Sequence, residues 1–449
     1  MATVTGRSPG DRSRGIDRRR RDKIIIVGLL VLAVVYPIVF RSLEAAVPFL
    51  PWPGTSVLIV CATFAILALG LNIVMGFAGL LDLGYVAFYA IGAYTTAFLA
   101  SSHFGIHITW WIVVWVAVAA ASVSGILLGA PTLRLRGDYL AIVTLGFGEI
   151  VRLVFRNLGD FTLVLPAILG GAVLIGPNAN LTGGNVGINP IDPPTIPIAG
   201  PWGEQLIFSN QNAIFSFYLI LALLILTYLI CARLRDSKLG RAWMAIREDE
   251  TAAAAMGINT VTTKLLAFSL GASFSGFAGA FTGAYQTAIF AESFNFAVSI
   301  IVVVIIILGG IGSLRGVVIG AFAVQYVNFT LLAWAGQYLN PPVNALGASI
   351  GIELLSDFNL VTYNYLIFGV ILAIMMVKRP EGLFPVDAAK AEMHGIGVAA
   401  EVTAGSADQL ALAEEAGAEV DPPSGAEAAL RADTPPETAR DEDHPVDTR

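Results

Sequence analysis

The sequence predicts an all-α polytopic membrane protein with about ten transmembrane helices, both termini in the cytoplasm and a disordered acidic C-terminal tail. Three observations support this prediction. Of the 449 residues, 56% are hydrophobic and 13% are charged, whereas about 25% are charged in a typical soluble domain. Apolar runs of about 17 residues or more recur, which is long enough to cross a bilayer core of about 30 Å as helices. Lys and Arg gather in the segments expected on one side of the membrane.

Ten apolar runs are the predicted spans. They cover residues 24–40, 57–75, 84–100, 110–130, 139–156, 213–232, 265–287, 296–311, 316–336 and 361–377. The first run follows a basic segment, residues 1–23, and no small-residue cleavage site comes after it. We therefore interpret it as a span and not as a signal peptide. The predicted transmembrane domain covers residues 24–386.

The positions of the basic residues predict the orientation of the chain. Residues 1–23 contain eight Lys or Arg, which places the N-terminus in the cytoplasm by the positive-inside rule. Alternate crossings from there place Arg134, the segment 233–264, Arg315 and Lys378 in the cytoplasm as well. Both termini are then cytoplasmic, and residues 157–212 form the longest external loop.

The acidic tail accounts for the net charge of −7. Residues 387–449 hold 15 Asp or Glu against four Lys or Arg, with few large apolar residues. Such a segment cannot bury enough apolar surface to offset the entropy of ordering it. We predict that it is disordered.

No pattern predicts a metal site, a cofactor or enzymatic chemistry. Cys61 and Cys231 lie inside apolar runs 170 residues apart and are interpreted as packing residues. No His stands at ligand spacing from another Cys or His, and no G-x-x-x-x-G-K-[ST] phosphate loop is present. We expect a chain that binds no cofactor, hydrolyses no ATP itself and has no nucleic-acid partner.

The segment 233–264 is the longest charged stretch between strongly apolar runs. It contains an apolar stripe at helical spacing, formed by Leu239, Trp243 and Ile246. Asp249 is a suitable N-cap, and Gly257 stands where a helix would stop. These features predict two short helices at a membrane surface, joined by a charged elbow. From this stretch alone, a solvated loop is an equal alternative.

Two glycine-rich junctions, residues 76–84 and 309–316, are predicted at the cytoplasmic face. Their candidate pathway or gating residues are Gly76, Gly79, Asp82, Gly84, Gly309, Gly310, Gly312 and Arg315. Glycine-interrupted apolar segments in the two halves of a transporter often mark its pathway. Tight loops between helices are at least as good an interpretation. That Asp82 pairs with Arg315 is a hypothesis.

Ionisable residues in the fifth predicted span are a second pathway candidate. Glu149 and Arg152 are three residues apart and can pair on a helix. We favour a structural ion pair over direct contact with a substrate. In the seventh span, 265–287, many Gly, Ala and Ser residues predict close helix–helix contact.

The external loop 157–212 contains an apolar insert, residues 161–176, that is short and broken by Pro and Gly. We interpret it as a re-entrant or interfacial segment and not as a span. A Gly-, Pro- and Asn-rich stretch follows, and is read as turns. An external docking surface and a plain connector are equally good interpretations; the docking candidates are Thr182, Gly183, Gly184 and Asn185.

Six stretches of the chain carry a resemblance to a known family. They are ALGLNIVMGFAGLLDLGYVAFYAIGAYTTAFL, LRLRGDYLAIVTLGFGEIVRLVFRN, LTGGNVGI, LGRAWMAIREDETAAAAMGI, KLLAFSLGASFSGFAGAF and KRPEGLFP. Together they resemble the M-type permease subunit of branched-chain amino acid ABC importers. The resemblance covers about residues 57–386. It implies a permease domain in a bacterial cell membrane that forms a heterodimer with an H-type permease subunit, and further partners: two cytoplasmic ATP-binding subunits and an external substrate-binding protein.

The resemblance also places the ATPase-coupling loop of the family on residues 233–264. Its implied coupling residues are Leu239, Arg241, Trp243, Ile246, Arg247, Glu248, Glu250 and Gly257. The general importer signature E-A-A-x-x-x-G is altered here, with Thr251-Ala252-Ala253 before Gly257, which puts the contact role of Glu250 in doubt.

Three other functions remain alternatives at this stage. An ion-coupled secondary amino-acid transporter would use intramembrane acids such as Asp82 or Glu149, but would leave the segment 233–264 without a role. A channel would need a repeated charged or carbonyl-rich filter, which the sequence does not show. A permease of the same family for urea or other amino acids remains open.

Overall fold

The computed structural model describes residues 34–40, 42, 46–47, 50–132, 138–158, 161–164, 173–199, 205–350, 357–378 and 383. The chain divides after Val386, and every described residue lies before that point. The basic segment 1–23 and the acidic tail 387–449 lie outside the described residues. The cytoplasmic position of both termini and the disorder of the tail therefore stay predictions.

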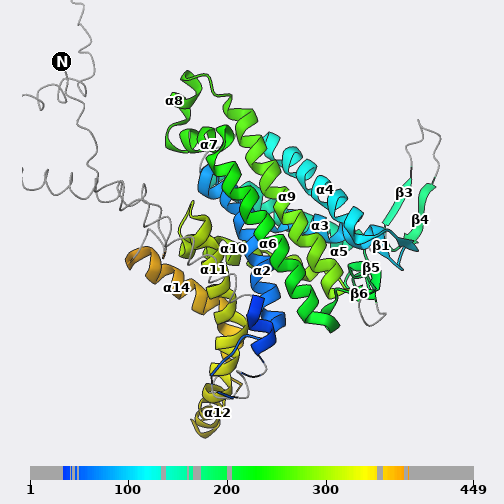
Figure 1. The fold of residues 1–449 in the computed structure, drawn as a ribbon, viewed down its shortest axis with the longest axis vertical. Coiled ribbons are helices and arrows are strands. Elements are labelled where there is room, and N and C mark those ends of the chain that lie inside the picture. The colour runs from blue at the N-terminus through cyan, green and yellow to red at the C-terminus, as the bar shows by residue number, and fades with distance from the viewer. Residues whose placement is uncertain are drawn as a thin grey trace, which may run out of the picture. The chain divides into compact units, whose positions relative to one another are not determined.

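Helices make up most of the described chain (Figure 1). They are α2 (Thr55–Asn72), α3 (Val86–Leu99), α4 (Trp110–Thr132), α5 (Asp138–Asn157), α6 (Ala213–Asp236), α7 (Lys238–Glu248), α8 (Glu250–Ala255), α9 (Thr260–Gln286), α10 (Phe296–Gly309), α11 (Leu314–Tyr326), α12 (Leu332–Ile350) and α14 (Asn364–Lys378). Two π-helical turns, η1 (Ile73–Phe77) and η6 (Val327–Leu331), extend α2 and join α11 to α12. A 3-10 turn, η5 (Ala291–Phe294), precedes α10.

Six helical runs in the described residues are long and apolar enough to cross a membrane. They are Thr55–Phe77, Trp110–Thr132, Asn210–Asp236, Thr260–Gln286, Ala291–Gly309 and Leu314–Ile350. Two shorter apolar helices, Val86–Leu99 and Leu360–Met375, accompany them. The chain is therefore a mostly helical, multi-pass membrane protein, as predicted. The count of ten spans stays a prediction, since α5 carries several charged residues and residues 24–33 lie outside the described part.

Three short β-ribbons correct the all-α prediction. The antiparallel pairs are β1 (Ala100–Ser101) with β2 (Ile106–His107), β3 (Phe161–Val164) with β4 (Val173–Ala179), and β5 (Thr195–Ala199) with β6 (Gln205–Ile207). In register, Ala100 faces His107, Phe161 faces Ala179 and Thr195 faces Ile207. The described parts of the apolar insert 161–176, residues 161–164 and 173–176, thus belong to a β-ribbon. Their Phe, Thr, Val and Ile residues favour strands, and strand pairing satisfies backbone groups that a short isolated segment would leave without partners.

The core forms around α9 and α2. Helix α9 packs along α3 and α4, while α2 contacts α6, α9 and α11. A side chain on Gly276 would collide with Ala121 of α4, and Gly92 of α3 lies directly against the Gly276 backbone. The close contacts predicted from the small residues of 265–287 are confirmed. Cys61 and Cys231 are buried and free, as packing residues should be.

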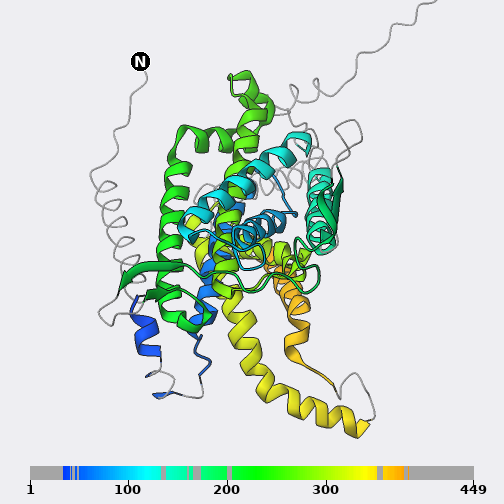
Figure 2. The ribbon, with the colours of Figure 1, turned by 90° about the vertical axis from the view of Figure 1, so that its right-hand side faces the viewer.

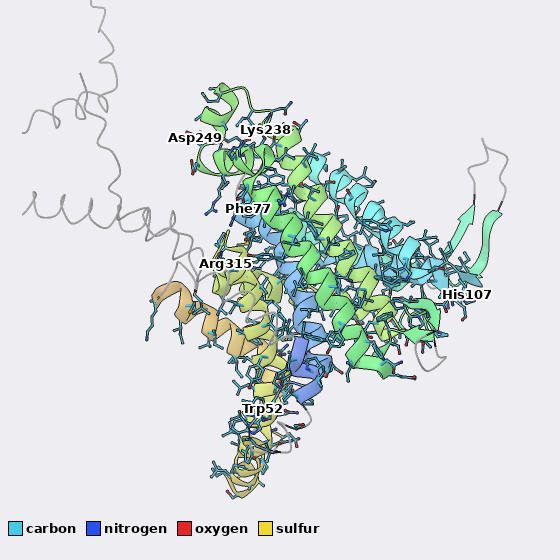
Figure 3. All side chains as sticks on the ribbon, in the orientation of Figure 1. Trp52, Phe77, His107, Lys238, Asp249 and Arg315 are labelled. Atoms are coloured by element: carbon cyan, nitrogen blue, oxygen red, sulfur yellow. The ribbon has the colours of Figure 1, made fainter. Side chains whose placement is uncertain are left out.

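The long helices separate two ends of the molecule (Figures 1 and 2). At one end, called the coupling end, α7 and α8 project beyond α6 and α9. At the opposite end lie β1, β5 and β6. Figure 3 shows Lys238 and Asp249 at the coupling end and His107 at the opposite end.

Candidate coupling site and pathway

The coupling end contains the two short helices predicted for residues 233–264. The Ser237 side chain caps α7 by accepting a hydrogen bond from the N–H of Gly240 at 3.2 Å. Asp249 caps α8, since its Oδ1 accepts from the N–H groups of Thr251 and Ala252. Beyond α8, Gly257 has a φ of 86°, which ends the helix without steric cost. The prediction of two helices joined by a charged elbow is confirmed.

Trp243 anchors α7 to the body of the molecule. Its ring is fully buried and its Nε1–H donates to the carbonyl of Thr263 at 2.7 Å. Ile246 is buried beside it. Leu239 was predicted on the same stripe but is 36% exposed, because Gly240 is the residue of that turn that packs against the end of α6.

The charged residues of the segment 233–264 make contacts in different directions. Arg247 Nη1 donates to the carbonyl of Gly76 at 2.6 Å, and Arg241 Nη1 donates to the carbonyl of Asp236 at 2.9 Å. Glu250 Oε1 lies 2.6 Å from Lys264 Nζ, an ion pair that the sequence reasoning missed. Glu248 is exposed on the outer face of α7.

The two glycine-rich junctions lie against each other at this end. The N–H of Gly312 donates to Oδ1 of Asn72 at 2.9 Å, and a side chain on Gly76 would collide with both residues. Arg247 lies beside Gly79 and near Gly312 as well. Sequence reasoning missed Asn72, although a lone Asn in an apolar run was a signal for a buried polar contact.

The remaining glycines of the two junctions form turns and a close contact. Gly309 and Gly316 lie backbone to backbone, so that neither position has room for a side chain. Positive φ angles occur at Gly79 (71°), Gly310 (106°) and Gly312 (82°).

Asp82 lies in the first junction and is 1% exposed. Its Oδ1 accepts a hydrogen bond from the N–H of Gly84 at 2.9 Å, while its Oδ2 is buried and has no hydrogen-bond partner among the described residues. Beside it, Thr144 of α5 accepts from the N–H of Leu83 at 3.1 Å. The hydrogen bonds of Asp82 thus do not include the hypothetical pairing with Arg315. The bond between Leu83 and Thr144 joins the start of α3 to α5, where a side chain on Gly84 would collide with the Thr144 carbonyl.

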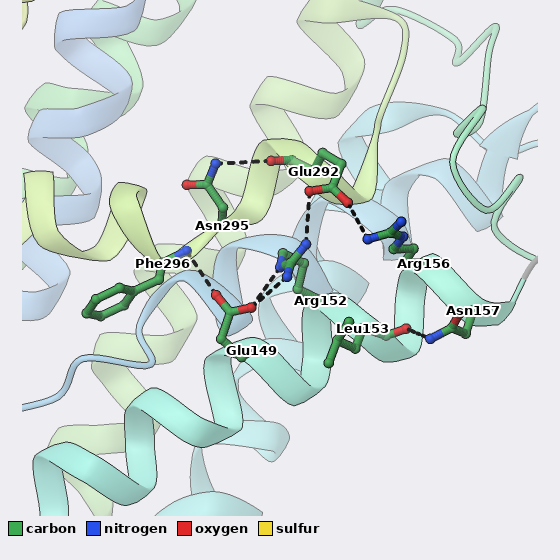
Figure 4. A network of polar contacts seen from close by, with 8 residues as sticks. All are labelled: Glu149, Arg152, Leu153, Arg156, Asn157, Glu292, Asn295 and Phe296. Atoms are coloured by element: carbon green, nitrogen blue, oxygen red, sulfur yellow. Dashed lines mark hydrogen bonds and ion pairs between the residues drawn. The ribbon is translucent and has the colours of Figure 1, made fainter. Parts of the chain in front are cut away.

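A network of four charges joins α5 to η5 at the opposite end (Figure 4). Arg152 Nε donates to Glu149 Oε2 at 2.9 Å and its Nη1 donates to Glu292 Oε2 at 2.9 Å. Arg156 Nη1 lies 3.2 Å from Glu292 Oε1, and Glu149 Oε1 accepts from the N–H of Phe296. The predicted pairing of Glu149 with Arg152 is confirmed. Glu292 was missed because it stands in a connection 140 residues further along the chain.

The external docking candidates form one tight turn at the opposite end. Thr182 and Gly183 are buried, Gly184 is half-buried and Asn185 is exposed. The buried Thr182 supports the turn, since its Oγ1 accepts from the N–H of Gly184 at 3.4 Å, and its part in external docking stays a prediction. Val186, which the sequence reasoning passed over, is 80% exposed. Within the described residues, no cluster of His, Cys, Asp or Glu could hold a metal ion.

Comparison of the sequence with known proteins identifies its family. The family model of branched-chain amino acid transport system permease components matches residues 55–376. The high-affinity branched-chain amino acid transport system permease protein LivM of Escherichia coli (strain K12) is 37% identical over 383 residues, which cover 81% of this chain and 75% of that protein. The permease protein LivH of Salmonella typhimurium is 27% identical over 270 residues, covering 58% and 78%.

Another relative is the probable branched-chain amino acid transport permease protein LivM of Methanocaldococcus jannaschii. It is 26% identical over 274 residues, which cover 60% of this chain and 67% of that protein. No solved structure matches the chain. With the family model matching residues 55–376, the chain belongs to the family of branched-chain amino acid transport permease components.

Proposed function

We propose that this chain is the M-type permease subunit of an ATP-driven importer for leucine, isoleucine and valine. It forms the translocation pathway as a heterodimer with an H-type permease of the same family. Two cytoplasmic ATP-binding subunits and an external substrate-binding protein complete the importer in a bacterial cell membrane. The names of the relatives LivM and LivH support the permease pair and the substrate class.

The exposed tip of the elbow carries the proposal. Met256 is 84% exposed and Leu239 is 36% exposed, both at the coupling end where α7 and α8 project. Methionine adapts its shape to a partner surface, and exposed apolar residues rimmed by charges are typical of protein–protein contacts. The exposed Glu248 belongs to this rim. We assign this tip to docking of the ATP-binding subunits.

Arg247 connects helix α7 to the membrane domain, so that a movement of α7 can be transmitted. Its guanidinium holds the carbonyl of Gly76 at the end of η1 and lies near Gly312 in the second junction. A push on α7 from the ATP-binding subunits is then applied to both junctions together. The helices that these junctions connect, α2 with α3 and α10 with α11, would reorient to open the pathway alternately to each side.

The energy source tests this function directly. Proteoliposomes with the complete importer should take up radiolabelled leucine when ATP is supplied in the lumen, on the side of the ATP-binding subunits. This uptake should continue when an uncoupler is present. Uptake that follows the proton gradient while ATP is held constant would contradict the proposal. It would favour a secondary transporter, for which the buried carboxylate of Asp82 is the best coupling group.

Two matched substitutions test the docking surface. Met256→Asp should release the ATP-binding subunits from the purified complex, because it places a charge in an apolar contact. Val186→Asp makes the same kind of change at a similarly exposed residue of the opposite end, and should leave these subunits bound. If both variants retain the ATP-binding subunits equally, the assignment of Met256 to the docking surface is wrong.

A further inference from the structure

One face of helix α5 is apolar and is not covered by the described part of the chain. Helix α5 packs against α3 and η5, and Leu140 and Thr144 on its inner side are buried. The outer face occupies about a third of the helix circumference. In its middle, Gly146 has open space where a side chain would project. The exposed large residues of this face are Tyr139, Ile142, Val143, Ile150, Leu153 and Val154.

A charged residue lies at the edge of this apolar face. The side chain of Glu149 is 32% exposed, although it pairs with Arg152 (Figure 4). The 20 residues of α5 are about 30 Å long, which is the thickness of a bilayer core. Glu149 lies about 12 Å before Asn157, the last residue of the helix. An ionised group exposed at this depth is costly in hydrocarbon, so the outer side of α5 requires protein or water against it.

Helix α14 shows what a lipid-facing helix of this chain looks like. Its exposed large residues include Leu366, Val370, Ile374 and Val377, and the only charged residue in the helix is Lys378, at its end. Such a face leaves no charged group in hydrocarbon. Both helices therefore expose apolar side chains, and the exposed charge within the span distinguishes α5 from α14.

A cavity opens in the outer face of α5, between α5 and α4. Its volume is about 330 Å³. Two of its lining residues on α5, Val143 and Ile150, are also exposed, so the cavity is open to whatever covers the face. From α4, Leu128 and Pro131 line it. In protein–protein interfaces, pockets of this kind receive the anchor side chains of the partner.

We propose that the outer face of α5 is the contact surface for the H-type permease subunit, and that an apolar side chain of that subunit fills the cavity between α4 and α5. The inference rests on the proposed function and names the surface that joins its permease pair. The relatives LivM and LivH are both permease proteins of a high-affinity branched-chain amino acid transport system. This favours an H-type subunit over a second copy of this chain.

The inner side of α5 connects this surface to the coupling end. Thr144 accepts a hydrogen bond from the N–H of Leu83, and Gly148 lies directly against the backbone of Gly84. Both partners belong to the first glycine-rich junction, whose Gly76 carbonyl is held by Arg247. A movement of the elbow that shifts this junction therefore also shifts α5 against the partner subunit.

Photocross-linking in membranes that contain both permease subunits tests the proposal. The probe is p-benzoylphenylalanine, placed at Ile142 or Ile150 on α5 and, as matched controls, at Leu366 or Val370 on α14, which are similarly exposed. The α5 positions should cross-link to the H-type subunit, whereas the α14 positions should give lipid adducts and no such cross-link. Cross-links from α5 to lipid alone, or to a second copy of this chain, would overturn the proposal.

A matched pair of isoleucines measures the strength of the contact. Ile150 is 57% exposed at the cavity, and Ile374 is 50% exposed on α14. Ile150→Ala should weaken the permease pair about fivefold or more, as truncation of an interface anchor does, and Ile374→Ala should not weaken it. Retention of the H-type subunit on the purified chain through a dilution series measures this. Equal retention in the two variants would overturn the proposal.

Two glycines provide variants that add bulk in place of removing it. Gly146 and Gly369 both have open space where a side chain would project, so phenylalanine at either position can be accommodated within this chain. Gly146→Phe should obstruct the cavity and lower retention of the H-type subunit about tenfold, whereas Gly369→Phe on α14 should leave it unchanged. Wild-type retention in Gly146→Phe would overturn the proposed surface. Failure of the wild-type importer to transport any branched-chain amino acid would instead refute the proposed function.

Discussion

The two ends of this permease are held together by different kinds of contact. At the opposite end, backbone hydrogen bonds fasten the chain that follows the turn 182–185 to the body: the N–H and carbonyl of Ile188 pair with those of Ile289, and the N–H of Ile191 donates to the carbonyl of Thr287. The four-charge network of Arg152 adds to them. At the coupling end, the hydrogen bonds and ion pair that hold α7 and α8 to the body come from side chains, those of Trp243, Arg247 and Lys264.

This difference suits two different tasks. A surface that is held by several backbone hydrogen bonds keeps its shape, because these bonds must break together for it to open. A helix pair held by a few side chains can shift as a unit when those contacts rearrange. We infer that the opposite end is a rigid platform and that the coupling end is a lever. The following substitutions test this distinction, from the largest expected effect to the smallest.

Trp243→Ala should have the largest effect, because the ring is fully buried and is the main anchor of α7. Truncation of a buried aromatic side chain costs about 3–5 kcal/mol of folding free energy. Thermal unfolding of the purified complex should show a clear loss of stability, and hydrogen exchange should rise in α7 and α8. Leu239→Ala, on the same helix but partly exposed, should change the stability of the permease pair without its ATP-binding subunits by about 0.5 kcal/mol or less. Equal losses of stability in the two variants would contradict the role of Trp243 as the main anchor of α7.

Arg247→Met should uncouple the importer without unfolding it. The variant keeps much of the apolar stem and loses the bond to the Gly76 carbonyl. We expect leucine uptake to fall about tenfold or more, which corresponds to about 1.4 kcal/mol, while ATP hydrolysis continues. Arg241→Met is the control, because its bond stays within the elbow at Asp236. A parallel fall of uptake and hydrolysis in Arg247→Met would show that it damages docking and does not transmit movement.

The sequence predicted the local features of both ends, but not the contacts between distant segments. Helix caps such as Asp249, the stop at Gly257 and the pairing of Glu149 with Arg152 depend on residues three or four apart, where helical geometry fixes the neighbours. The partners Glu292 and Asn72 come from other parts of the chain. Hydrophobic periodicity carries no information about which helices contact each other. The sequence therefore identified the two glycine-rich junctions, but not the contact between them.

Arg152→Met should weaken the platform moderately. It leaves Glu149 and Glu292 without their shared partner, but Glu292 is more than half exposed and water screens it. We expect a loss of about 1 kcal/mol of stability at low salt, and less at high salt. Thermal unfolding across a salt series measures this, with Arg156→Met as the smaller effect, since Arg156 contacts Glu292 from a more exposed position. A larger loss in Arg156→Met would reverse the order of the two arginines in the network.

Substitution of Glu250 should give the smallest effect. It distinguishes a contact with the ATP-binding subunits from the ion pair with Lys264. As an ATPase contact, as the loop of the family implies, Glu250→Gln would release the ATP-binding subunits. In the structure its Oε1 pairs with Lys264, whose side chain is 10% exposed while that of Glu250 is 41% exposed. A double-mutant cycle of Glu250→Gln with Lys264→Met should give a coupling energy of about 0.5–1 kcal/mol, and the subunits should stay bound. If the subunits are released and no coupling energy to Lys264 is measured, Glu250 contacts the ATP-binding subunits and its ion pair with Lys264 does not contribute to stability.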